Sequence, residues 1–375
     1  MIDTPMSRRS VLAGIGAATL PLPIAAAPKP ATITLFAGGY NREGGRGVLP
    51  LAYTPADERW QADEPVAAAP DASYAVHSSR FGLHYLVQEG TEGTVNAFRV
   101  RDGQWQQLAH LSSGGADPCH LALDPRQSVL AAANYSSGSV TLFRLDPRTG
   151  LPIGPGTVHA HQGSGPDRER QTQPHAHWIG FTPDNRWLRA VDLGADTIFA
   201  YPFDAAQGRL GAAQVAYRAE PGSGPRHLAF HPSRPFAYLA SELANTVTVL
   251  RLGNGATLHA VATLSTLPAD FTGKSFAGAI VINTAGTRLY VSNRGHDSVA
   301  VFGIGADGTA SLIQHVGCGG RWPRLIHLLE GRSRLLVANQ RSGGIAAFRI
   351  GTDGRLAPHG SGTAAPGVAY IGEVA

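Results

Sequence analysis

Four side chains of the kinds used in acid–base chemistry fall at matching points of a repeated pattern: His177, Arg226, Glu242 and Arg294. A glutamate or a histidine can take a proton from water, and an imidazole with an ordinary pKa near 6.5 suits that role. Arginines keep their charge and offer planar groups for a carboxylate, a phosphate or a developing oxyanion. Together these residues predict chemistry on a small molecule, provided that the fold brings them together.

The same residues also have a purely structural interpretation. Glu242 could pair with Arg226 or Arg294 and tie neighbouring repeats to each other. We favour catalysis or ligand binding, because perturbed charged groups concentrate at functional sites.

The elements that must position these residues form a repeat. Short apolar runs rich in β-branched and aromatic residues are bounded by Gly, Pro, Asn and Asp, which is typical of strands and hairpins. The residues that end the second run of each unit are separated by 46, 58, 49, 52 and 46 positions. A period near fifty with about four strands per unit indicates a β-propeller. Six units lie between about 70 and 360, and the strand-like ends at 33–36 and 367–371 are expected to combine into a seventh blade.

Two positions of each unit should meet on one face of the disk: the start of the innermost strand and the end of the next. The units are bland elsewhere but differ from one another here, which suggests a site on that face. The first ring is Ser73, Cys119, His177, Arg226, Gly278 and Arg324, and the second is Glu89, Tyr135, Leu193, Glu242, Arg294 and Gln340.

Four segments in order resemble the lactonase family of seven-bladed propellers, which includes 6-phosphogluconolactonases and fungal carboxy-muconate cyclases. They are 163–177, 224–232, 241–247 and 290–295. The resemblance implies an all-β, seven-bladed propeller of four-stranded antiparallel blades, closed by the N- and C-terminal strands. It also implies a site of one histidine, two arginines and a glutamate in the channel mouth. By motif these are His177, or its neighbour His175, with Arg226, Arg294 and Glu242.

The resemblance further implies hydrolysis of a sugar lactone or a related small lactone, with no cofactor. Two alternatives stay open: a lactonising cycloisomerase that acts on a muconate, and a propeller that only binds a ligand or a partner of the cell envelope. The substrate is expected to be a small lactone or carboxylate. The ring residues expected to bind it are His175, Glu89, Tyr135, Arg324 and Gln340.

Other polar residues receive weaker interpretations. His175 and His177 have the spacing that puts two side chains on one face of a strand, as in a metal site, but no acidic or cysteine partner is near in sequence, so we predict no metal. His227 and His231 sit in the recurring strand–turn frame and are expected to be structural. The charged segment 167–170 lies in the longest interval and is either a solvated loop or a lid.

The first residues have the pattern of an export signal. Arg8 and Arg9 precede a short apolar stretch and Ala25–Ala27, which is typical of a twin-arginine signal peptide. We therefore expect a signal over 1–27, recognition by the twin-arginine export machinery, and a single propeller domain over 28–375 in the periplasm.

The composition excludes other classes of partner. No other segment is long and apolar enough for a membrane span. A net charge of +4 without a dense basic stripe argues against nucleic acid. Cys119 and Cys318 do not suggest a disulfide framework and are expected to be small buried residues.

Overall fold

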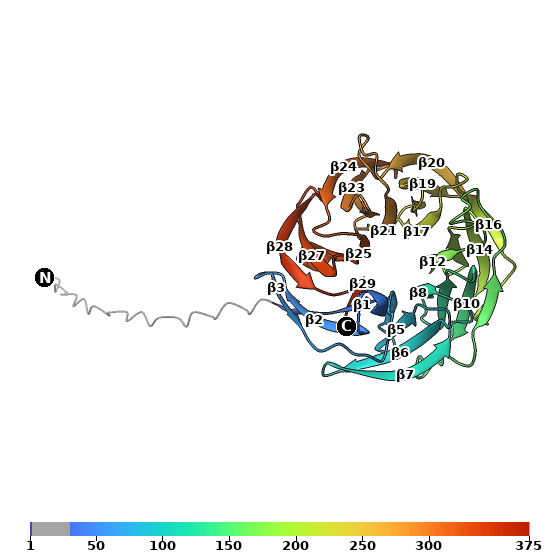
Figure 1. Ribbon diagram of the computed structural model, residues 1–375, viewed down its shortest axis with the longest axis horizontal. Coiled ribbons are helices and arrows are strands. Elements are labelled where there is room, and N and C mark those ends of the chain that lie inside the picture. Colours follow the sequence, from blue (N-terminus) through green and yellow to red (C-terminus); the bar gives the residue numbers. More distant parts are fainter. Residues whose placement is uncertain (2–30, 375) are drawn as a thin grey trace.

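The strands of this protein are arranged as seven antiparallel sheets around a central axis (Figure 1). The computed structural model describes residues 31–374 together with Met1. The prediction of an all-β, seven-bladed propeller is confirmed, with one addition: blade 4 carries a fifth strand. Apart from Met1, the expected signal at 1–27 lies outside the described residues. No helix within residues 31–374 could cross a membrane.

In the first four blades the strands follow one another along the chain, except that the innermost strand of blade 1 is the last strand of the protein. Blade 1 is β1 (Ile33–Gly39), β2 (Val48–Thr54), β3 (Arg59–Ala62) and β29 (Val368–Glu373); blade 2 is β4 (Ala75–Ser78), β5 (Leu83–Gln88), β6 (Thr94–Arg101) and β7 (Gln104–Ser112); blade 3 is β8 (Pro118–Leu123), β9 (Val129–Asn134), β10 (Ser139–Arg144) and β11 (Thr157–Ala160); blade 4 is β12 (Ala176–Phe181), β13 (Trp187–Asp192), β14 (Thr197–Asp204), β15 (Arg209–Leu210) and β16 (Gln214–Arg218).

The remaining three blades repeat the same order from the axis outward. Blade 5 is β17 (Pro225–Phe230), β18 (Phe236–Ser241), β19 (Thr246–Leu252) and β20 (Leu258–Ser265); blade 6 is β21 (Phe276–Ile282), β22 (Arg288–Arg294), β23 (Ser298–Ile304) and β24 (Ala310–Gly317); blade 7 is β25 (Pro323–Leu329), β26 (Arg334–Asn339), β27 (Gly344–Ile350) and β28 (Leu356–Ala364). Two short 3-10 turns, η1 (Asn41–Glu43) and η2 (Glu330–Arg332), complete the elements.

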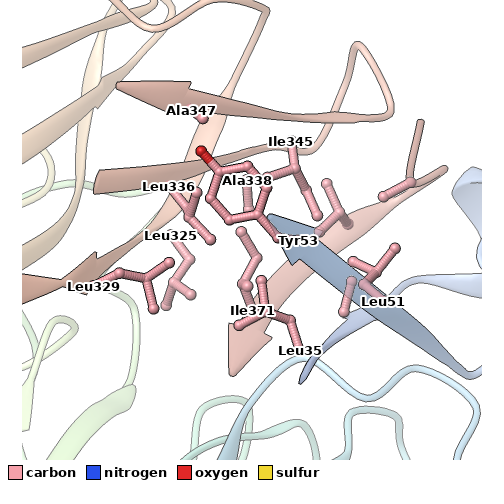
Figure 2. Packing of buried hydrophobic residues seen from close by; sticks show 13 residues of the cluster. Leu35, Leu51, Tyr53, Leu325, Leu329, Leu336, Ala338, Ile345, Ala347 and Ile371 are labelled. Atoms are coloured by element: carbon pink, nitrogen blue, oxygen red, sulfur yellow. The ribbon is translucent and has the colours of Figure 1, made fainter. Parts of the chain in front are cut away.

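The two ends of the chain close the ring. The last strand, β29, is the innermost strand of blade 1 and pairs antiparallel with β1, for example through Phe36 and Gly372. Side chains of blade 7 then pack against this mixed blade: Leu336 and Ile345 share one buried cluster with Leu35, Tyr53 and Ile371 (Figure 2). The expectation that both ends combine into the seventh blade is confirmed, and closure leaves no blade without a neighbour.

The hydrophobic core is divided among the blade interfaces. Seven buried clusters each combine side chains of two adjacent blades, one cluster per interface. A middle strand is therefore covered on both faces, which explains why β9 is an unbroken run of buried residues. The outer strand β7 has no such cover and consists of exposed and half-buried residues. Apolar runs near the axis and polar ones at the rim follow from this stacking.

Tyrosines link consecutive blades across these interfaces. Tyr85, Tyr238 and Tyr290 occupy equivalent places in second strands and are essentially fully buried. Each hydroxyl donates a hydrogen bond to a glycine carbonyl in the outer hairpin turn of the next blade, at 2.5, 2.9 and 3.0 Å. A buried hydroxyl needs such a partner, so the three bonds fix how neighbouring blades are oriented.

Candidate active site

The first ring of predicted residues stands on β-bulges. In four innermost strands the pairing register shifts around a single residue: Cys119 in β8, His177 in β12, Arg226 in β17 and Arg324 in β25. A bulge inserts one extra residue and re-aims its side chain out of the normal alternation. The repeated bulge is how an otherwise apolar strand presents one polar residue at this level of the channel.

The second ring is fixed by buried asparagines. Asn293 precedes Arg294, and its Nδ2 donates to the carbonyl of Thr266 at 2.8 Å. Asn339 precedes Gln340 and donates to the carbonyl of Cys318 at 3.0 Å. Both asparagines are essentially fully buried, so these bonds hold the strand ends firmly and set the position of the residue that follows.

Glu242 is the centre of the site. Its Oε2 lies 2.6 Å from Arg294 Nη2 and 3.1 Å from Arg226 Nε. Its Oε1 accepts a hydrogen bond of 2.8 Å from Nη2 of a third arginine, Arg170. Arg226 and Arg294 are buried, whereas the Arg170 side chain is one-third exposed. Both carboxylate oxygens are therefore occupied by guanidinium groups.

The electrostatics of this cluster favour an ionised carboxylate. Burial by itself would raise the pKa of Glu242, but the charges of Arg294 and Arg226 outweigh it and hold that pKa well below its usual range. Burial, together with the charge of Arg294, lowers the pKa of Arg226 to about 9, so that arginine still carries its charge at neutral pH. The cluster holds one negative and three positive charges, which is an excess of positive charge suited to anions.

His177 lies beside this cluster as a neutral imidazole. Burial and the charge of Arg226 hold the pKa of His177 well below 6.5. Its Nδ1 is 3.8 Å from Cys119 Sγ, and its ring meets Tyr135 edge-on with centroids 5.4 Å apart. Burial also raises the pKa of the Cys119 thiol, so Cys119 is not an activated nucleophile.

His227, expected to be structural, supports an arginine of the site. Arg226 Nη1 lies 3.1 Å from His227 Nε2, and because arginine can only donate, Nε2 is the acceptor. His231 lies in a turn, where its Nδ1 accepts hydrogen bonds from the backbone N–H groups of Ser233 and Arg234.

The cavity over the cluster has two adjoining compartments. The inner one, about 180 Å³, reaches His177 and Cys119 and is also lined by Glu89 and Tyr135. The outer one, about 270 Å³, opens toward Trp322 and Arg341. Both compartments share the same four boundary residues: Arg170, Glu242, Arg294 and Arg324.

The structure brings most of the residues predicted from sequence to this cavity. His177, Glu242, Arg294, Glu89, Tyr135, Arg324 and Gln340 line one or both compartments. Arg226 contacts Glu242 but lines neither compartment. Glu89 accepts a hydrogen bond from Tyr40 and pairs with Arg324, and Gln340 donates to Glu43 at 2.8 Å.

His175 differs from expectation. It precedes β12, stacks flat on Tyr135 and is hydrogen-bonding distance, 3.0 Å, from that residue's carbonyl, so it supports the wall and does not line the cavity. The bulge at His177 interrupts the alternation that strand spacing assumed for the two histidines. Among residues 31–374 no three His, Cys, Asp or Glu side chains are grouped as metal ligands would be.

Several cavity residues were not singled out from the sequence. Arg170 lay within a charged loop and within the family-like segment 163–177 but received no role, although the 58-residue interval marked that loop as unusual. Trp322 and Arg341 flank predicted ring positions in the chain. Glu43 belongs to blade 1, where the repeat is split between the two ends of the chain and gave no alignment.

Comparison with known proteins agrees with this geometry. The family model described as "Lactonase, 7-bladed beta-propeller" matches residues 34–371. The 6-phosphogluconolactonase of Bacillus subtilis is 34% identical over 297 residues, covering 77% of this chain and 83% of the relative. The structure of a periplasmic gluconolactonase from Pseudomonas aeruginosa superposes with a TM-score of 0.85 at 28% identity, covering 92% of this chain and 99% of that one. A protein from Lactobacillus plantarum superposes with a TM-score of 0.84 at 27% identity, covering 92% and 99%. This chain belongs to the lactonase family of seven-bladed β-propellers.

Proposed function

We propose that this lactonase hydrolyses a sugar lactone in the periplasm. The observation that carries the proposal is the cavity in which neutral His177 adjoins three arginines gathered around Glu242. A relative of this chain is a 6-phosphogluconolactonase and a structural neighbour is a periplasmic gluconolactonase, which supports a sugar lactone as the substrate. The paired arginines and apolar stretch at the N-terminus support export through the twin-arginine route.

His177 is the better candidate for the base. Its low pKa keeps the imidazole unprotonated at neutral pH, and within the described part of the chain the approach of Nδ1 to Cys119 is its one hydrogen-bond contact with another side chain. Glu242 is unprotonated as well, but both of its oxygens are already occupied by arginines. A carboxylate so engaged is a weak base but a firm anchor for the arginines.

The proposed hydrolysis proceeds by addition of water to the lactone carbonyl and cleavage of the ring C–O bond. A water molecule gives a proton to His177 as its oxygen bonds to the lactone carbonyl carbon, and the negative charge on the carbonyl oxygen is held by Arg294 and Arg170. The ring C–O bond then breaks, and the leaving alkoxide takes the proton back from His177 to become a hydroxyl. The product is an open-chain hydroxy acid, which releases a proton at neutral pH.

The test uses purified protein comprising residues 28–375. Proton release above the spontaneous rate is followed with glucono-1,5-lactone, its 6-phosphate and γ-butyrolactone, for the natural chain and for His177→Gln and Glu242→Gln. We expect His177→Gln to lower kcat at least 100-fold, the usual contribution of a positioned base. His259→Gln, on exposed strand β20, is the matched control and should stay fully active.

Other outcomes would redirect the assignment. Full activity of His177→Gln would remove His177 from the mechanism. No release from any lactone would favour the muconate cycloisomerase, tested next with muconates, or a propeller that only binds. Export is tested separately by replacing Arg8 and Arg9 with lysine: the precursor should then stay in the cytoplasm, whereas unchanged periplasmic recovery would contradict the twin-arginine route.

A further inference from the structure

The outer compartment carries more positive charge than the chemistry at Glu242 requires. Its lining contains five arginines and two glutamates: Arg42, Arg170, Arg294, Arg324 and Arg341 with Glu43 and Glu242. Arg170 and Arg294 are paired with Glu242, and Arg324 lies 3.5 Å from Glu89. Arg42 approaches Glu43 only loosely, at 3.9 Å, and is largely exposed.

Arg341 is the cation of this compartment that no carboxylate neutralises. Across residues 31–374, no acidic side chain lies within ion-pair distance of its guanidinium. Instead, the guanidinium carbon stands 3.4 Å from the ring centroid of Trp322, which is a stacking distance. A stacked guanidinium keeps its edge N–H donors available for a planar or tetrahedral anion.

Trp322 is held in an uncommon conformation to provide that surface. Its φ is 65°, and among the described non-glycine residues with positive φ it is the one aromatic residue. A bulky side chain normally avoids this region, and outliers of this kind gather where a position is functionally required. The Trp322 backbone N–H donates to Asp297 Oδ1 at 2.8 Å. The Trp322 carbonyl accepts from the Gln340 backbone N–H at 3.0 Å, so the backbone is fixed on both sides of this residue.

The indole also borders the catalytic cluster. The Arg294 guanidinium lies 5.7 Å from the Trp322 ring, and the Phe276 ring lies 6.0 Å away. Trp322 therefore connects the arginine that contacts Glu242 with the arginine at the cavity mouth. A substrate whose carbonyl lies at Arg294 would extend its far end toward Arg341.

We infer that the outer compartment is an anion-binding subsite in which Arg341, held on Trp322, binds a phosphate or carboxylate carried by the substrate at the end remote from the lactone. The inference rests on the proposed function for the identity of the sugar lactone. It adds a residue that determines specificity: Arg341 distinguishes charged sugar lactones from neutral ones.

The experiment measures binding without turnover. Dissociation constants are obtained by calorimetry for gluconate, 6-phosphogluconate and glucarate. Compared with gluconate, 6-phosphogluconate has an added phosphate at the far end, and glucarate has a carboxylate there. We expect the natural protein to bind at least one of the two acids that carry a second anionic group about tenfold more tightly than gluconate, and the comparison identifies which anion fits. In Arg341→Gln this advantage should disappear while gluconate affinity is kept.

Two further variants make the result specific. Arg321→Gln is the matched control, because Arg321 is an exposed arginine next to Trp322, in the connection between β24 and β25, and does not line the cavity. Trp322→Gly removes the indole but accepts the left-handed backbone, so the loop can keep its path, and it should lose the same advantage as Arg341→Gln. Thermal unfolding of each variant confirms that it is folded.

Three results would overturn the inference: no preference for a second anion in the natural protein, an Arg341→Gln variant that keeps the preference, or an equal loss in Arg321→Gln, which would indicate only long-range charge. These outcomes are independent of the proposed reaction. Absence of lactone turnover with a preserved binding preference would refute the lactonase assignment and leave the anion subsite in place.

Discussion

At the residue scale, the site depends on one buried carboxylate that three arginines share. Removing one member of a buried charge cluster leaves the others without compensation, which is far more damaging than losing a surface ion pair. Glu242 therefore fixes Arg226, Arg294 and Arg170, although it is engaged too fully to act as the base. The structural and functional interpretations of Glu242 are compatible, because the bonds that link the blades also aim the arginines.

The pH dependence of catalysis follows from the state of His177. Burial and Arg226 lower its pKa well below 6.5, and the base must be unprotonated, so activity is lost only when the pH falls through that lowered pKa. We expect kcat/KM, corrected for spontaneous hydrolysis, to stay constant between pH 7.5 and 6.5 and to decline only at lower pH. An acidic limb centred at or above pH 6.5 would contradict this assignment.

At the element scale, the long connection between β11 and β12 is an arm that hydrogen bonds hold in place. Gln171 is fully buried and donates to the carbonyl of Leu193, while Asp167 Oδ1 accepts the backbone N–H groups of Glu169 and Arg170. These bonds place the Arg170 guanidinium on Glu242. Arg168 and Glu169 are exposed, whereas Asp167 and Arg170 are half-buried, so the segment 167–170 is solvated on one side and supplies the third arginine on the other.

Removing the Asp167 turn should loosen this arm. Asp167→Ala deletes two hydrogen bonds, each contributing about 1 kcal/mol, and we expect kcat/KM to fall roughly 5- to 30-fold with little change in Tm. Asp146→Ala is the control, because Asp146 Oδ1 accepts two backbone N–H groups in the same way in a turn that does not line the cavity. Equal activity losses in both variants would show that the arm has no specific role.

The regular repetition of the strands determines which parts of the fold and of the site could be predicted from the sequence. The blades and both rings could be predicted because each unit repeats its strands and turns locally, which places His177, Arg226, Glu242 and Arg294 without knowledge of distant contacts. Arg170 could not be assigned, because its position depends on the path of a loop that no repeat constrains. His175 was misplaced, because a bulge depends on how two strands pair and not on the spacing within one.

At the scale of the whole molecule, stability is distributed over seven interfaces, and tyrosine hydroxyls reinforce three of them. Tyr238→Phe would leave the buried carbonyl of Gly308 without its partner, at a cost of about 1–3 kcal/mol in the free energy of unfolding, measured with denaturant. Tyr217→Phe should be nearly neutral, because within the described residues its hydroxyl forms no hydrogen bond with a side chain or carbonyl. Similar losses in both variants would contradict the role of the blade-to-blade bond.

The ring should also be sensitive to acid through two buried histidines, His84 and His120. Burial lowers the pKa of His84 to about 4 and that of His120 to about 3. Between these values and 6.5 the unfolded chain binds protons that the folded chain does not, so stability falls as the pH drops below 6.5. Each histidine should account for about 2 kcal/mol between pH 7.5 and 5.

Denaturant unfolding at several pH values checks this expectation. His84→Gln, which cannot titrate, should have a shallower loss of stability with acidification than the natural chain. His259→Gln, on the exposed face of β20, should follow the natural chain. A natural chain whose unfolding free energy is unchanged from pH 7.5 to 5 would contradict neutral burial of these histidines.

The pairing of β1 with β29 has a consequence for the order of the chain itself. Since the first and last strands are neighbours in one sheet, the two ends of the propeller could be joined by a short linker and the chain reopened in any connection between blades. Such a circular permutant, cut for example between β7 and β8, would build every blade from consecutive residues. The same cavity would then form in a molecule that needs no terminal strand to lock it.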